Sequence, residues 1–232
     1  MRLSTTLISP RTTLCRKTSS TQSSGVKSAA KAGIAAVALF MSMGAVAESG
    51  DAAAGEKLTT ACQACHGSDG NGLAPNYPNI AGQNQNYLFR QLQMIQSEER
   101  SAPLMAGQLN GMSEQNLRDI AAFYASTAPK LAQAQGDDEQ IAMARRIYKG
   151  GALDKGVAAC TACHSPTGSG NGPAGFPRIS GQTPEYTIAQ LTAYREGVRA
   201  TDEIYGGMMR QVAANLNDTE IAALADYLQG LH

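Results

Sequence analysis

The sequence predicts an all-α protein built from two tandem small helical domains. Three observations lead to this prediction. The second part of the chain repeats the first, apolar residues recur at helical spacing behind good N-cap residues, and no segment alternates convincingly as a strand. A chain of 232 residues fits one or two domains, and the internal repeat decides for two.

The duplication is visible in two pairs of segments. "YPNIAGQNQNYLFRQLQ" (77–93) corresponds to "FPRISGQTPEYTIAQLT" (176–192), with a shift of 99 residues. "MAGQLNGMSEQNLRDIAAFYA", from Met105, corresponds to "MRQVAANLNDTEIAALADYLQ", from Met209, with a shift of 104 residues. We therefore expect a first domain over 48–128, a linker over 129–138 and a second domain over 139–232.

Each half reads as a helix, a cysteine motif, a Gly- and Pro-rich loop, a middle helix, another loop and a last helix. The predicted first and middle helices cover 51–61 and 85–97 in the first half, and 139–149 and 184–196 in the second. The last helices begin at Ser113 and Asn217, which are good N-cap residues, and Glu220 completes a capping box with Asn217.

The first 47 residues resemble an export signal. They contain six Lys or Arg residues and no acid, and they end in an uncharged stretch closing with "AVA". This stretch is shorter than the roughly 20 apolar residues of a membrane-spanning helix. We expect a signal peptide over 1–47, cleavage after Ala47 and a periplasmic protein. An uncleaved anchor, an organelle transit peptide and a true start near Val26 are the alternatives.

The chain from Glu48 onward is acidic. It keeps all 19 acidic residues but only 13 of the 19 basic ones, a net formal charge of −6. This balance argues against nucleic-acid binding, which favours basic stripes. Cys15 falls in the part expected to be removed, so the exported chain has no spare thiol.

Cysteine and histidine are concentrated in two copies of Cys-x-x-Cys-His. Four of the five Cys and two of the three His lie in these motifs: Cys62, Cys65, His66, Cys160, Cys163 and His164. A dithiol redox pair needs no following His, and a zinc ribbon places its halves roughly 15–20 residues apart, whereas these lie 98 apart. The motif is the attachment signature of c-type haem. We expect two haem c groups, each bound covalently by two Cys, with His66 and His164 as iron ligands.

The second axial ligand of each iron is expected to be methionine. His232 is the only remaining His of the exported chain and Cys is used up, so Met105 and Met209, at equivalent positions of the repeat, are the candidates. Both are expected in loops. The other methionines considered, Met94, Met112, Met143 and Met208, are assigned to the core, with Met208 as the one competitor. An iron with both axial sites filled has no position for a substrate, so we expect an electron carrier and not an enzyme.

Two further pairs accompany the motifs. The Pro78 and Pro177 carbonyls could accept the second ring N–H of the histidines, or these could be ordinary loop prolines. Tyr87 and Tyr186 could reach haem propionates or cap a helix, and we favour packing.

The sequence resembles the cytochrome c4 family in a combination of motifs. These are two Cys-x-x-Cys-His halves, "YPNIAGQ" and "FPRISGQ", the following Tyr-x-x-x-Gln-Leu, "YREG" and the ending "YLQGLH". The resemblance covers 48–232. It implies two class I cytochrome c domains, each around one covalently attached haem, with His66/Met105 and His164/Met209 as axial pairs. It also implies electron delivery in the periplasmic respiratory chain, from the cytochrome bc complex (quinol-cytochrome c reductase) to a terminal oxidase. The first-half segment "ERSAPLMAG" departs from the second half's "RATDEIYGGMM", which weakens the assignment of Met105.

Two other functions stay open. One is the dihaem cytochrome subunit of a flavoprotein dehydrogenase of the sulfide dehydrogenase type. The other is a two-haem peroxidase, which would need an iron that can open and a longer chain. The sequence leaves the two reduction potentials and peripheral association with the membrane open.

Overall fold

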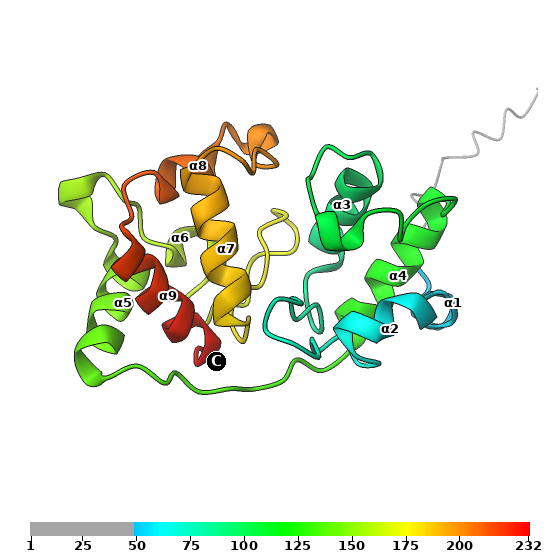
Figure 1. Ribbon diagram of the computed structural model, residues 1–232, viewed down its shortest axis with the longest axis horizontal. Helices are drawn as coiled ribbons and strands as arrows, with labels where there is room; N and C mark the ends of the chain where they lie inside the picture. Colours follow the sequence, from blue (N-terminus) through cyan, green and yellow to red (C-terminus); the bar gives the residue numbers. More distant parts are fainter. Residues whose placement is uncertain (1–48) are drawn as a thin grey trace, which may run out of the picture. The chain divides into compact units, whose positions relative to one another are not determined.

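The structure is a computed structural model that describes residues 49–232 (Figure 1). The expected signal peptide, its cleavage site and Cys15 lie outside the described residues. Over the part of the chain that is described, no helix combines the length and apolar character needed to cross a membrane.

The first half contains four α-helices and a short 3₁₀ turn: α1 (Ala52–Leu58), α2 (Thr60–His66), α3 (Gln85–Gln96), η1 (Pro103–Met105) and α4 (Glu114–Ser126). Both α1 and α3 pack against α4. The core between them includes Leu88, Ile120, Ala121 and Tyr124.

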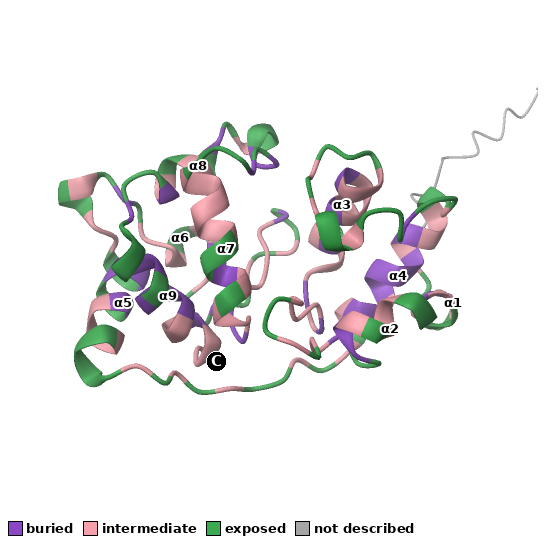
Figure 2. Cartoon of the chain, viewed as in Figure 1, coloured by how far each residue is buried: buried purple, intermediate pink, exposed green. Residues whose placement is uncertain are grey.

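The second half repeats this plan with additions: α5 (Asp138–Gly150), η2 (Leu153–Lys155), α6 (Thr161–His164), α7 (Pro184–Arg195), η3 (Glu203–Tyr205), α8 (Met208–Ala213) and α9 (Asp218–Gln229). Here α5 and α7 pack against α9, and α8 packs against α7. Figure 2 shows that buried residues concentrate on α4 in the first half and on α9 in the second. The two halves therefore have separate cores organised around their last helices.

The close crossing of α1 and α4 depends on a glycine. A Cβ on Gly55 would lie 2.0 Å from the carbonyl oxygen of Asp119, closer than any side chain tolerates. Asp119 also accepts a hydrogen bond from the backbone N of Asp51, at 2.8 Å, which fixes the start of α1. Absence of a side chain at Gly55 thus lets two backbones meet directly.

Most predicted elements are confirmed. The middle helices end one residue earlier than expected, and both last helices carry capping boxes, at Ser113 and Asn217. In residues 49–232 the only β-type pairings are two isolated bridges, so the expectation of an all-α fold holds. The predicted helix over 51–61 is divided at Thr59, whose hydroxyl donates to the Glu56 carbonyl at 2.7 Å and ends α1.

Candidate haem sites

Each Cys-x-x-Cys-His motif ends a helix and places its histidine in the interior. α2 ends at His66 and α6 ends at His164, and these two residues are only 6% and 7% exposed. Burial lowers the pKa of both imidazoles from the ordinary value. Each ring is therefore neutral near pH 7 and can offer a nitrogen lone pair to a metal.

The prolines fix which ring nitrogen is available. His66 Nδ1 lies 3.0 Å from the carbonyl oxygen of Pro78, and His164 Nδ1 lies 2.9 Å from that of Pro177. Since a carbonyl can only accept, the Nδ1 atoms carry the protons and the Nε2 atoms remain for iron. Of the two interpretations of Pro78 and Pro177 that the sequence leaves open, these contacts support carbonyls that accept from the histidines.

Backbone hydrogen bonds hold these proline loops in the same way in both halves. The Gly70 carbonyl accepts from the backbone N of Ile80 at 2.8 Å and of Ala81 at 3.0 Å. In the second half the Gly168 carbonyl accepts from Ile179 at 2.8 Å and from Ser180 at 3.1 Å. The Gly- and Pro-rich loops are thus ordered structures that present a carbonyl to each histidine.

The four motif cysteines are half-buried and form no disulfide. Before haem is attached, burial raises the pKa of the Cys62 thiol above its ordinary value and that of Cys160 to about 11. Within residues 49–232 no three His, Cys, Asp or Glu side chains gather as a metal cluster. The arrangement does not match a zinc site, whereas two cysteines followed by a buried histidine in each motif suit covalent haem attachment.

The two candidate methionines lie in different local structures. Met105 is half-buried and ends η1. Met209 is also half-buried, but it lies in the first turn of α8, so the expectation of a loop is wrong at this position. The neighbouring Met208 is more exposed, and its Sδ lies 3.7 Å from the Sγ of Cys163.

The start of α8 is fixed by a buried carboxylate that sequence reasoning missed. Asp202 is 4% exposed and accepts two hydrogen bonds from Arg210, one from the backbone N at 2.9 Å and one from Nε at 2.8 Å. An acceptor for a first-turn N–H stabilises a helix start in the way an N-cap does. The sequence signal was weak because Asp202 lies several residues before the helix.

Two further residues that sequence reasoning missed, one in each half, hold the segments that follow the methionines. Gln96 Nε2 donates to the carbonyls of Leu109 and Met112, at 2.8 and 2.9 Å. Arg195, 99 residues later, donates to the carbonyl of Leu216 at 3.1 Å. Alignment of the two halves pairs Gln96 with Arg195, but their different chemistry concealed the shared role.

Two arginines from opposite halves share one set of polar partners. Arg199 is 7% exposed and donates to the Tyr87 hydroxyl at 3.1 Å, while Arg100 donates to the Tyr186 hydroxyl at 2.8 Å. Both also donate to Gln91 Oε1, at 2.9 and 2.7 Å. The two tyrosines were expected only to pack; instead their hydroxyls accept from guanidinium groups.

This arginine cluster lacks a carboxylate. In the described part of the chain neither Arg100 nor Arg199 forms an ion pair, and Arg100 Nε is buried without a hydrogen-bond partner. Buried cations are normally paired with anions. The carboxylate-bearing propionates of haem have the charge that this cluster would accept, so the residues present fit the cofactor.

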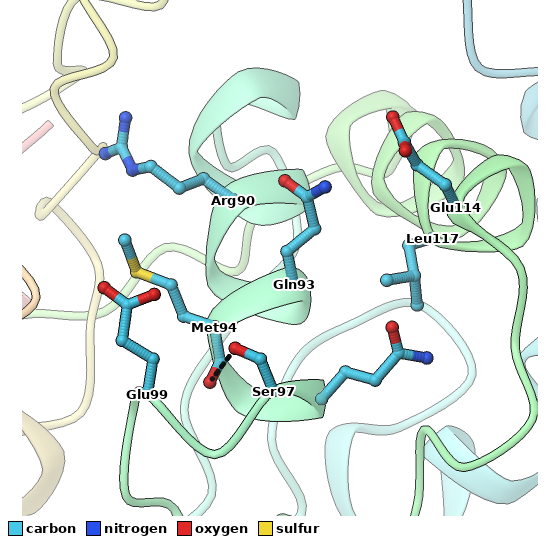
Figure 3. A pocket seen from close by; sticks show the side chains of 8 residues that line it. Arg90, Gln93, Met94, Ser97, Glu99, Glu114 and Leu117 are labelled. Carbon is cyan, nitrogen blue, oxygen red and sulfur yellow. Dashed lines mark hydrogen bonds between the residues drawn. The ribbon is translucent and has the colours of Figure 1, made fainter.

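A separate pocket of about 440 Å³ lies between α3 and the start of α4 (Figure 3). Its walls are Arg90, Gln93, Met94, Gln96, Ser97, Glu99, Glu114 and Leu117. None of the motif residues or candidate methionines lines it. The pocket is therefore not part of the candidate haem sites.

Comparison with known proteins agrees with this geometry. The sequence model of the family described as cytochrome c matches residues 52–128 and 149–232. The chain is 44% identical to cytochrome c4 of Azotobacter vinelandii over 192 residues, covering 79% of this chain and 90% of the relative. A more distant relative, the thiosulfate dehydrogenase electron acceptor of Stutzerimonas stutzeri, is 33% identical over 84% of this chain and 91% of its own length.

Among solved structures, reduced recombinant cytochrome c4 from Pseudomonas stutzeri superimposes with a TM-score of 0.76 at 44% identity. The match covers 79% of this chain and all of the solved one. Together with the two Cys-x-x-Cys-His motifs, these similarities establish two covalently bound haem c groups in two cytochrome c domains. The chain belongs to the cytochrome c family and, within it, to the cytochromes c4, which makes it a dihaem electron-transfer protein.

Proposed function

We propose that this cytochrome carries single electrons through two irons that have no open coordination position, with His66/Met105 and His164/Met209 as axial pairs. The observation that carries the proposal is the repeated contact between a buried histidine Nδ1 and a proline carbonyl, at 3.0 and 2.9 Å. Two sites built alike in one chain suit a carrier of electrons. Bound haem would supply a one-electron Fe(II)/Fe(III) couple.

The protein's own groups define the properties of that couple. The Pro78 and Pro177 carbonyls bind Nδ1 of each imidazole, so that only Nε2 remains available to bind a metal. Met105 and Met209 as ligands would raise the reduction potential, as in other cytochromes c. A histidine and a methionine at each iron would leave no position for a substrate, which argues against the peroxidase alternative.

We further propose export to the periplasm by a signal peptide over 1–47. The domains would then cover 48–128 and 139–232, joined by a linker over 129–138. In this setting quinol-cytochrome c reductase would be the electron donor and a terminal oxidase the acceptor. Peripheral association with the membrane would bring the carrier close to both complexes.

A second candidate function is supported by the more distant relatives. Two of them bear the name thiosulfate dehydrogenase electron acceptor, at 33% and 32% identity. A structure of a thiosulfate dehydrogenase also resembles this chain, with a TM-score of 0.69 and 28% identity. The chain would then accept electrons directly from a dehydrogenase, a role close to the flavoprotein-linked alternative that the sequence left open.

Rapid-mixing kinetics separate the two candidates. The oxidised cytochrome is mixed with reduced quinol-cytochrome c reductase or with a thiosulfate dehydrogenase and its substrate, and haem reduction is followed optically. The main proposal predicts fast reduction by the first and subsequent oxidation by a terminal oxidase. Fast reduction by the dehydrogenase alone would favour the second candidate and contradict the first.

A further inference from the structure

Two glutamines, Gln83 and Gln182, each bind one residue of the opposite half through both ends of the side-chain amide. Gln182 Oε1 accepts from the backbone N of Asn79 at 2.8 Å, and its Nε2 donates to the Asn79 carbonyl at 2.9 Å. Gln83 does the same to Arg178, with 2.7 Å for each contact. The two glutamines lie 99 residues apart in the sequence, as do Asn79 and Arg178, so the arrangement is reciprocal.

The residues bound in this way adjoin the prolines that hold the histidines. The backbone N of Asn79 and the carbonyl of Pro78 belong to the same peptide group. Gln182 therefore contacts one side of this group, and His66 Nδ1 contacts the other side at 3.0 Å. Two hydrogen bonds, joined by this one peptide group, therefore connect Gln182 Oε1 of the second half to the His66 ring of the first half.

The second-half site has the same connection in the reverse direction. The backbone N of Arg178 and the carbonyl of Pro177 form one peptide group, which receives Gln83 Oε1 on one side and His164 Nδ1 at 2.9 Å on the other. Each histidine is thus linked to the glutamine of the opposite half. Neither histidine is linked in this way to the glutamine of its own half.

A peptide group transmits polarisation between its two ends. When its N–H donates to Gln Oε1, electron density shifts toward the carbonyl oxygen, which becomes a stronger acceptor. Such chains strengthen each bond by about 10–30% in condensed-phase estimates. A stronger acceptor at Nδ1 makes the imidazole a more basic ligand, and a more basic ligand favours the more highly charged metal.

We infer that Gln182 and Gln83 are positioning residues for His66 and His164, respectively, and that each lowers the reduction potential of the haem in the opposite half. The inference rests on the proposed function in one respect, namely that the two histidines are iron ligands. It deepens that proposal because it gives the interface between the halves a part in setting both potentials. Each haem then depends on a residue of the half that does not bind it.

The test uses the full-length dihaem protein with Gln182→Met or Gln83→Met. Methionine approximates the length of glutamine and cannot reproduce the amide contacts. The potential of each haem is measured by a redox titration in which the NMR signals of the two haems are followed separately. Gln182→Met should raise the potential of the first-half haem and leave the other unchanged, and Gln83→Met should do the reverse.

A matched control is available next to Gln182. Thr183 Oγ1 donates to the Pro75 carbonyl at 2.7 Å, a contact between the halves that does not involve the Pro78–Asn79 peptide group. Thr183→Val should leave both potentials unchanged. A shift in this control as large as that in Gln182→Met would mean that loosening of the interface causes the change, and would overturn the inference.

Gln182→Glu provides a second variant, because a carboxylate still accepts from the Asn79 N–H but no longer donates to the Asn79 carbonyl. The first haem's potential should stay at or below that of the unmodified protein, and a rise would contradict the inference. Three results with the methionine variants would also contradict the inference. They are a shift in the reduction potential of the haem in the variant's own half alone, an equal shift in the potentials of both haems, and no shift in either variant. Failure of the proposed function would differ, since the unmodified protein itself would then lack two six-coordinate haems.

Discussion

Asp202 holds Arg210 by two hydrogen bonds, of 2.9 Å to the backbone N and 2.8 Å to Nε, and so determines where α8 begins. Met209 is the residue directly before Arg210 and lies in that first turn. The position of the proposed methionine ligand therefore depends on a carboxylate seven residues earlier.

Asp202→Ala should weaken methionine ligation at the second haem. Loss of a buried charged acceptor costs about 2 kcal/mol, and the released helix start no longer holds Met209 in place. When pH or temperature is raised, the far-red absorption band of methionine-ligated ferric haem should disappear for one of the two haems at a lower value than in the unmodified protein.

The exposed neighbour Glu203 supplies the control. It also contacts Arg210, but 75% of its side chain is exposed, so Glu203→Ala should leave the band unchanged. Equal behaviour of the two variants would show that Asp202 has no special role in positioning Met209.

Adjacent methionines allow a direct test of ligand identity. Met209→Ala should remove the far-red band of one haem and open its iron to small ligands, whereas Met208→Ala should change neither. Magnetic circular dichroism of the oxidised protein measures the number of methionine-ligated irons. The reverse pattern would assign the ligand to Met208, whose sulfur lies 3.7 Å from that of Cys163.

Removal of one attachment motif should leave the other haem in place. Cys62→Ala combined with Cys65→Ala should yield a chain with one covalent haem, since the two halves have separate cores. Denaturing gel electrophoresis with haem staining and mass spectrometry measure the remaining attachment. The equivalent double substitution at Cys160 and Cys163 is the matched variant, and loss of both haems from either would contradict independent sites.

The second half should lose stability in acid through Glu220. Burial acts to raise the pKa of Glu220, but hydrogen bonds from Lys155 and from the backbone of Asn217 outweigh burial and leave the pKa below its ordinary value. The carboxylate is therefore more acidic in the folded state than in the unfolded one. The charged carboxylate therefore stabilises the fold at neutral pH. This stabilisation is lost as the pH falls below the ordinary Glu pKa of about 4.3 and then through the lower pKa of the folded state.

Glu220→Gln keeps the side-chain acceptor of the capping box but removes the charge that faces Lys155 at 2.6 Å. It should reduce the free energy of unfolding of the second half by roughly 1 kcal/mol at neutral pH and by nothing near pH 3. Chemical denaturation at the two pH values measures this difference. Glu114→Gln, at an exposed ion pair with Arg118, should have little effect at either pH.

Local sequence signals were sufficient for much of the fold. The last helices followed from apolar residues at helical spacing behind Ser113 and Asn217, because N-capping is decided by neighbouring residues. The proline carbonyls could be named as candidate acceptors because Pro78 and Pro177 lie at similar distances after the two motif histidines, but an ordinary loop role was an equal alternative.

Contacts between distant segments were beyond the sequence. The position of Met209 on a helix depends on Asp202, and the division of the first helix depends on the buried Thr59. The partners of Arg100 and Arg199 come from both halves, so their association required the folded structure. Gln83 and Gln182 were visible as a repeated pair, but their crossed binding was not.

The most direct test of the account is a titration of the fully reduced protein with carbon monoxide at neutral pH, followed by its absorption spectrum. Two closed irons with histidine and methionine ligands predict the spectrum of two low-spin haems per chain and no change on addition of the gas. Stoichiometric uptake of carbon monoxide by either haem of the unmodified protein would contradict the central claim.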